Sequence, residues 1–177
     1  MTRVNAITEE DASPKVKLIY EIIKKKNGRI PNIFLNMGNA PSVLEAFISL
    51  SDAASHTTFT PLLAEQIALS VSQANLCNYC ISAHTAIGKA AGLSDSAIND
   101  ARKALAKPPK EQAILQFAKL LVEKKGKVTD EDIAMLKKSG VNDEEMLEIV
   151  LHVILNLFTN YFNHVTDPQI DFPEVKS

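Results

Sequence analysis

The chain is organised around ten residues near its middle, Asn75-Leu76-Cys77-Asn78-Tyr79-Cys80-Ile81-Ser82-Ala83-His84. This stretch holds the only two cysteines of the 177-residue chain, three positions apart, and a histidine four positions after the second. Positions i, i+3 and i+7 share one face of an α-helix, so Cys77, Cys80 and His84 are predicted to form a single stripe. Helical Cα atoms three residues apart lie roughly 5 Å from each other, which a disulfide can span. The stretch therefore predicts a helical dithiol with a base beside it.

A carboxylate upstream of the cysteines adds to this pattern. The helical neighbours of Glu65, three and four positions away, are all apolar: Pro61, Leu62, Ala68 and Leu69. Glu65 is therefore predicted to face the core side of its helix. His84 also has mainly apolar helical neighbours. Because a buried charge is costly unless it is paired, both residues are candidates for the same site as the dithiol.

The composition is that of a globular protein, with 46% hydrophobic and 23% charged residues. A net charge of −2 gives no indication of nucleic acid or an anionic membrane as a partner. The acidic N-terminal segment lacks an apolar core, which argues against a secretory signal, and no apolar run approaches membrane-spanning length. We expect a cytoplasmic protein, in which a CxxC pair is more often redox-active or metal-binding than structural.

Helix signals along the chain predict an all-α fold of about eight to nine helices. Capping residues precede several helical patterns, at Ser13, Thr60, Ser94, Thr129 and Asn142. The helix after Ser94 is expected to reach about Leu105. No segment alternates with a period of two residues, so no strand is expected. We predict a single domain over residues 1–177, made of a loose N-terminal helical part (1–59), a dithiol core (60–107), C-terminal helices (108–166) and a tail (167–177).

The last predicted helix, from Asn142 to about Asn163, is apolar nearly all round. A helix with such a surface is buried on several sides. In a chain of this size, another subunit could cover one of those sides. The helix therefore predicts a homo-oligomer with this helix in the interface.

The spacing of Glu65, Cys77, Cys80 and His84 resembles that of the AhpD-like alkylhydroperoxidases of the carboxymuconolactone decarboxylase superfamily. The flanking residues are similar too, and the specific resemblance covers residues 61–101. A looser likeness extends to Pro31-Asn32-Ile33-Phe34 and Asn160-Tyr161-Phe162-Asn163-His164. One position departs from the family pattern: a histidine usually precedes the second cysteine, and this chain has Tyr79 there. We expect Tyr79 to be an accessory residue that packs against or shields the site.

The resemblance implies an AhpD-like fold and a thiol-dependent peroxidase with Glu65, Cys77, Cys80 and His84 as catalytic residues. Cys80 would attack the peroxide and become a sulfenic acid, and Cys77 would then form the Cys77–Cys80 disulfide. His84 is one helical turn from Cys80 but two from Cys77, which also favours Cys80 as the attacking thiol. No bound cofactor or metal is expected. The implied partners are a peroxide substrate and a dithiol or lipoyl-bearing reductant, or a peroxiredoxin, and the implied assembly is a trimer or hexamer.

Other functions stay open at this point. A lactone enzyme of the carboxymuconolactone decarboxylase type would use His84 and Glu65 as acid and base, but it has no use for a second thiol. A non-catalytic oligomeric redox sensor would be oxidised reversibly without turnover. A structural zinc site usually takes four Cys or His ligands, and only three are local here. His152 and His164 lack thiol or carboxylate partners at useful spacing, and we expect both to be structural.

Overall fold

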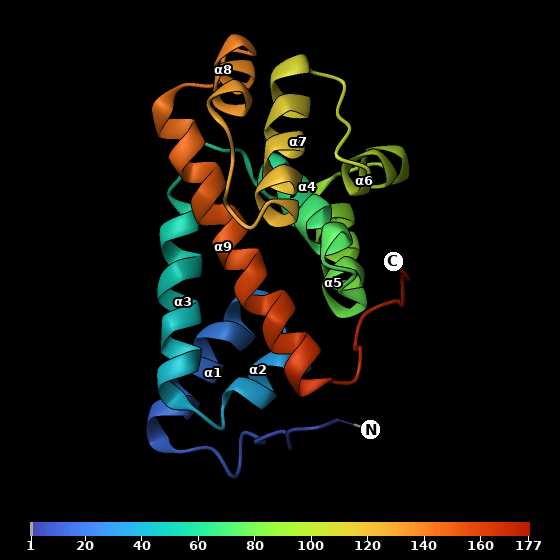
Figure 1. Cartoon of the computed structure of the whole chain (residues 1–177). Coiled ribbons are helices and arrows are strands. Elements are labelled where there is room, and N and C mark those ends of the chain that lie inside the picture. The colour runs from blue at the N-terminus through green and yellow to red at the C-terminus, as the bar shows by residue number, and fades with distance from the viewer. Residues whose placement is uncertain (1) are drawn as a thin grey trace.

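The computed structural model describes residues 2–177, and this part of the chain forms nine α-helices and no strand (Figure 1). The helices are α1 (Pro14–Asn27), α2 (Asn32–Met37), α3 (Pro41–Ser55), α4 (Pro61–Ala74), α5 (Asn78–Ala91), α6 (Asp95–Arg102), α7 (Pro109–Glu123), α8 (Asp130–Lys138) and α9 (Asp143–Thr166). The predicted all-α fold is confirmed. Within residues 2–177, no helix combines the length and the apolar character needed to cross a membrane.

Five helices begin at the capping residues that the sequence indicated. The side chains of Ser13, Thr60, Ser94, Thr129 and Asn142 each accept a hydrogen bond from the backbone N–H three residues later. Each bond satisfies an amide that has no partner inside the helix. These starts were predictable because the interaction lies within four consecutive residues.

Two helix ends differ from the sequence prediction. The helix after Ser94 was expected to reach about Leu105, but α6 ends at Arg102. Ala104 adopts a left-handed conformation with φ of 57°, which cannot continue a right-handed helix. Helix α9 runs to Thr166, beyond the expected end near Asn163, and stops where Asp167 turns left-handed with φ of 50°.

Helix α4 is the centre of the main hydrophobic core. It contacts α5, α6, α7 and α9, and its residues Ile67 and Leu69 are fully buried. They belong to one cluster with Leu115 of α7 and Ile149 of α9. In Figure 1, α9 runs diagonally along the molecule, with α3 on one side and α4 and α5 on the other. Glu65 and the start of α5 are therefore held by the most buried helix of the chain.

A second hydrophobic cluster surrounds the cysteines. Cys77 and Cys80 pack there with Val16 and Tyr20 of α1 and Leu44 of α3, among others. Side chains of the C-terminal tail, residues 167–177, pack against the same cluster. The N-terminal helices and the tail thus bury the dithiol from two sides.

Helix α9 has one buried and one exposed face in the single chain. The buried face includes Ile149, His152, Val153, Asn156, Asn160 and Asn163. The exposed side carries large apolar residues at helical spacing: Leu147, Val150, Ile154, Tyr161 and Val165. We call these five residues the α9 apolar stripe, which nothing within residues 2–177 covers.

Candidate active site

A tight turn between α4 and α5 places Cys77 at the N-terminus of α5. The backbone N–H of Leu76 donates to the carbonyl of Gln73 at 3.1 Å. The backbone N–H of Cys77 donates to the carbonyl of Ser72 at 3.0 Å. This is the pattern of a Schellman motif, whose left-handed position is usually glycine. Here Leu76 occupies that position, with φ of 55°. Leu76 projects outward and is 63% exposed, so it holds the turn without adding to the core.

Cys77 and Cys80 form a disulfide, as their spacing predicted, with Cα atoms 5.3 Å apart. Cys77 is the N-cap residue of α5 and lies just outside the helix, whereas Cys80 lies in the first turn. The Cys77 sulfur accepts a hydrogen bond from the Cys80 backbone N–H at 3.3 Å. An amide donor and the positive end of a helix dipole both favour a thiolate at this position. Both cysteines are buried, with exposed fractions of 2% and 3%.

His84 and Glu65 form the second part of the site. Nδ1 of His84 lies 2.8 Å from Oε2 of Glu65, which joins α5 to α4. A carboxylate can only accept, so Nδ1 carries the hydrogen and Nε2 of a neutral ring is left free to accept a proton. Both side chains keep about a fifth of their surface exposed, at 22% and 19%. His84 lies one helical turn after Cys80 on α5, and the His84–Glu65 pair is partly open to solvent.

Asn163 of α9 also contacts the dithiol, which no local sequence signal indicated. Its amide Nδ2 donates to the Cys80 sulfur at 3.2 Å. Two other asparagines lie on the same buried face of α9, Asn156 and Asn160, at helical spacing from it. A row of asparagines on one face of an otherwise apolar helix is the one sequence feature that could have indicated a polar site here, and no prediction above rested on it.

Tyr79 faces the C-terminal tail. Its hydroxyl donates to Oδ1 of Asp171 at 2.7 Å and accepts from the backbone N–H of Ile33 at 3.2 Å. Burial and the Asp171 carboxylate both raise the pKa of Tyr79, so the phenol stays neutral. Its ring meets the edge of Phe172, with centroids 5.8 Å apart. Tyr79 therefore ties the dithiol helix to the tail.

Further contacts hold the tail along α5 (Figure 1). The backbone N–H of Val175 donates to Ser82 at 2.9 Å, and that of Ser177 donates to Asn78 at 2.9 Å. Asp171 also pairs with Arg29. The tail thus covers the side of α5 that carries Tyr79 and Ser82.

The other two candidate histidines lie elsewhere. His152 is buried, and its Nε2 lies 2.9 Å from the hydroxyl of Thr57. Burial lowers the pKa of His152, whereas the charges of Glu148 and Glu65 act in the opposite direction. His164 places Nε2 3.0 Å from the carbonyl oxygen of Asn75, at the end of α4. Within residues 2–177, neither histidine makes a hydrogen bond to a cysteine sulfur.

Residues 41–121 match the model of the carboxymuconolactone decarboxylase family. A solved structure of an alkylhydroperoxidase AhpD core, an uncharacterized peroxidase-related protein from Ralstonia eutropha JMP134, superposes with a TM-score of 0.85 at 22% identity, covering 97% of this chain and 92% of that one. The segment 41–121 of the chain is therefore similar to the carboxymuconolactone decarboxylase family, and the fold of the chain is AhpD-like.

Two further relatives share this AhpD-like fold. An uncharacterized peroxidase-related protein from Silicibacter sp. TM1040 has a TM-score of 0.80 and 22% identity, with 97% of each chain covered. A cysteine-to-alanine variant of the debrominase Bmp8, in complex with 2,3,4-tribromopyrrole, has a TM-score of 0.81 and 24% identity, covering 97% of this chain and 92% of that one. No curated protein matches the sequence.

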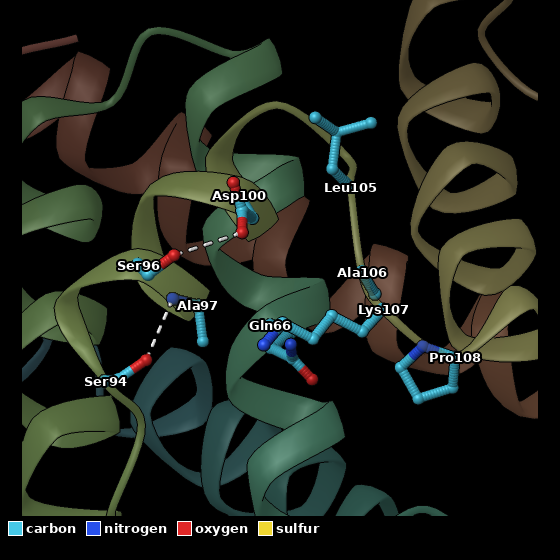
Figure 2. Close-up of a pocket in the computed structure, with 9 residues that line it drawn as sticks. All are labelled: Gln66, Ser94, Ser96, Ala97, Asp100, Leu105, Ala106, Lys107 and Pro108. Atoms are coloured by element: carbon cyan, nitrogen blue, oxygen red, sulfur yellow. Dashed lines mark hydrogen bonds between the residues drawn. The ribbon is translucent and has the colours of Figure 1, made fainter.

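A surface pocket of about 240 Å³ has a lining that includes neither cysteine (Figure 2). It is lined by Gln66, Ser94, Ser96, Ala97, Asp100, Leu105, Ala106, Lys107 and Pro108. The hydrogen bonds within it that involve side chains include the Ser94 cap of α6 and a contact between Ser96 and Asp100. None of the four predicted catalytic residues lines it.

Proposed function

We propose that this protein is a thiol-dependent peroxidase that reduces hydroperoxides through its Cys77–Cys80 dithiol. The observation that carries the proposal is the arrangement at the start of α5. A disulfide-forming pair is buried there, and a histidine hydrogen-bonded to a carboxylate follows one turn later. A thiolate nucleophile needs a base to take its proton and an acid to protonate the leaving group.

In the oxidative half-reaction, the Cys80 thiolate attacks the terminal oxygen of the hydroperoxide. A sulfur–oxygen bond forms, the O–O bond breaks, and the alkoxide leaves with a proton relayed by His84 and Glu65. The Cys77 sulfur then attacks the Cys80 sulfenic acid, and water leaves as the disulfide forms. As the N-cap residue of α5, Cys77 is well placed for this resolving step, because the helix N-terminus favours its thiolate.

An external dithiol closes the cycle by thiol–disulfide exchange and carries away the two electrons as its own disulfide. The family resemblance favours a lipoyl group, or a partner peroxiredoxin, in this role. The net reaction converts one hydroperoxide and one dithiol into an alcohol, water and one disulfide. No step uses a metal, a haem or a flavin.

The likeness to the debrominase Bmp8 supports a second candidate reaction. Reductive dehalogenation replaces a carbon–bromine bond by a carbon–hydrogen bond and releases bromide. A dithiol supplies the two electrons for this reaction by becoming a disulfide. The same Cys77–Cys80 pair could therefore serve a halogenated aromatic substrate.

Turnover assays with dihydrolipoamide as reductant separate these reactions. We expect the native chain to consume hydrogen peroxide or cumene hydroperoxide catalytically, and we expect Cys77→Ser and Cys80→Ser to abolish turnover. Bromide release from 2,3,4-tribromopyrrole without hydroperoxide turnover would favour dehalogenation instead. Reversible oxidation without turnover of either substrate would indicate a redox sensor. Lactone decarboxylation that survives Cys77→Ser would indicate the lactone enzyme.

A further inference from the structure

The contact between Asn163 and Cys80 joins α9 to the reacting thiol. Nδ2 of Asn163 lies 3.2 Å from the Cys80 sulfur, and the two side chains are 6% and 3% exposed. A disulfide sulfur has no hydrogen to donate, so the amide must present its N–H to it, which fixes the orientation of the side chain. A thiolate at the same position would accept a stronger hydrogen bond, because charged acceptors strengthen such bonds.

A polar network holds this part of α9 in place. Nδ2 of Asn75 donates to Oδ1 of Asn160 at 2.9 Å, and Asn160 donates in turn to the hydroxyl of Ser72 at 3.4 Å. His164 contacts the carbonyl of Asn75 at 3.0 Å. These bonds fix the register of α9 against the turn that carries Cys77. Asn163, one turn after Asn160, is therefore positioned by its helix as well as by its own contact.

The carbonyl oxygen of the same amide, Oδ1 of Asn163, is buried and has no hydrogen-bond partner within residues 2–177. A buried acceptor without a donor is destabilising, so such a group calls for a role beyond stability. The amide geometry holds this oxygen next to the nitrogen that contacts Cys80. A donor that arrives at the Cys80 sulfur would therefore meet it.

We propose that Asn163 is a catalytic residue of the dithiol site, with Nδ2 stabilising the Cys80 thiolate and Oδ1 accepting a hydrogen bond from the O–H of the hydroperoxide. This inference rests on the proposed peroxidase function and names the group that orients its substrate. The oxygen that carries the hydrogen is the one that Cys80 attacks. As the O–O bond breaks, the same O–H becomes that of the sulfenic acid and keeps its bond to Oδ1. The alkoxide leaves on the far side and takes its proton from the His84 pair.

Alkylation of Cys80 in a Cys77→Ser background tests the role of Nδ2 independently of peroxide chemistry. Adding Asn163→Leu should slow alkylation by iodoacetamide at neutral pH about tenfold, because a hydrogen bond to a charged group is lost. The rate should return to that of the parent at high pH, where Cys80 is a thiolate in both proteins. Asn163→Asp, which keeps the shape of the side chain but removes the donor, should slow alkylation at least as much and serves if Asn163→Leu does not fold.

The role of Oδ1 is tested at the same high pH by comparing two rates: the reaction of Cys80 with hydroperoxide and its reaction with iodoacetamide, which has no O–H. We expect Asn163→Leu to slow sulfenic acid formation about fivefold while leaving alkylation unchanged. Asn156→Leu is the matched control, because Asn156 is a buried asparagine of the same helix whose amide binds the carbonyl of His152. Asn156→Leu should change neither the rate of sulfenic acid formation nor the rate of alkylation.

Each role of Asn163 has its own contradicting result. Identical pH profiles of alkylation in the parent, Asn163→Leu and Asn163→Asp would overturn the role of Nδ2. An equal effect on hydroperoxide and iodoacetamide at high pH would overturn the role of Oδ1. If alkylation depends on Asn163 but the native chain, with both cysteines, does not turn over hydroperoxide, then the proposed function fails while the contact with Cys80 stands.

Discussion

At the scale of single residues, the pairing of His84 with Glu65 is the feature whose loss should be easiest to measure. Glu65→Gln keeps the shape of the side chain but removes the carboxylate that orients the ring of His84. We expect hydroperoxide turnover to fall about 100-fold, because general acid–base assistance is typically worth at least this much. The pH profile of kcat/KM should change as well, which loss of packing alone would not cause.

Glu148→Gln is the matched control for this prediction. Glu148 is also a half-buried carboxylate, but it binds the backbone N–H of Thr58 at 2.8 Å and lies on α9. We expect it to lower stability and leave turnover near the native value. If Glu65→Gln behaves in the same way, Glu65 has only a structural role.

The lowered pKa of His152 predicts how the free energy of unfolding depends on pH. Its burial lowers the pKa of its imidazole below the ordinary value near 6.5. Below about pH 6.5 the unfolded chain therefore binds a proton that the folded chain does not, so the free energy of unfolding should fall as the pH falls. Urea unfolding at about pH 7.5 and 5.5 measures this. In His152→Gln the decline should be smaller, and an equal decline in both proteins would contradict the assignment to His152.

At the scale of elements, the α4–α5 turn stores backbone strain at Leu76. A left-handed conformation costs a non-glycine residue about 1–2 kcal/mol, and glycine avoids this cost but loses about 0.4–1 kcal/mol through greater freedom of the unfolded chain. Leu76→Gly should therefore change the free energy of unfolding by between zero and about +1.6 kcal/mol, since the side chain is largely exposed. Leu76→Val should be destabilising by about 1 kcal/mol, because β-branching makes this conformation worse. An equal decrease in the free energy of unfolding in both variants would show that the Leu76 side chain stabilises the fold by packing.

The same elements show what the sequence could and could not predict. The starts of α1, α4, α6, α8 and α9 follow from capping residues, and the Cys77–Cys80 pairing follows from spacing, because both depend on residues within one helical turn. The bond from Asn163 to Cys80 joins positions 83 residues apart, and that from Tyr79 to Asp171 joins positions 92 apart. Such contacts depend on how α9 and the tail pack over α5, and helical periodicity does not encode this. The turn at Leu76 was also not predictable from the sequence, because the left-handed position of a Schellman motif is usually glycine.

At the scale of the whole molecule, the α9 apolar stripe supports a homo-oligomer, with a trimer or hexamer favoured by the family resemblance. Large apolar residues at helical spacing on one exposed face usually mark an interaction surface. We expect light scattering at micromolar concentration to give a multiple of the chain mass of 19.4 kDa. Ile154→Asp, in the middle of the stripe, should shift the protein toward the monomer mass.

Met135→Asp is the control for the assembly prediction. Met135 is a large apolar residue of α8 that is 71% exposed and lies outside the stripe. The Met135→Asp substitution should leave the oligomer unchanged. A native chain that scatters as a monomer would contradict the prediction.

The most direct measurement of how this protein reacts with peroxide is sulfenic acid labelling in the two single-cysteine variants. After a short exposure to hydroperoxide, Cys77→Ser should carry a sulfenic acid on Cys80 that dimedone traps and mass spectrometry locates. In Cys80→Ser, Cys77 should stay largely unoxidised at the same dose, because Asn163 donates to the Cys80 sulfur and His84 lies one helical turn from Cys80 but two from Cys77. The opposite labelling pattern would contradict this assignment and give the attacking role to Cys77, whose sulfur accepts the amide at the N-terminus of α5.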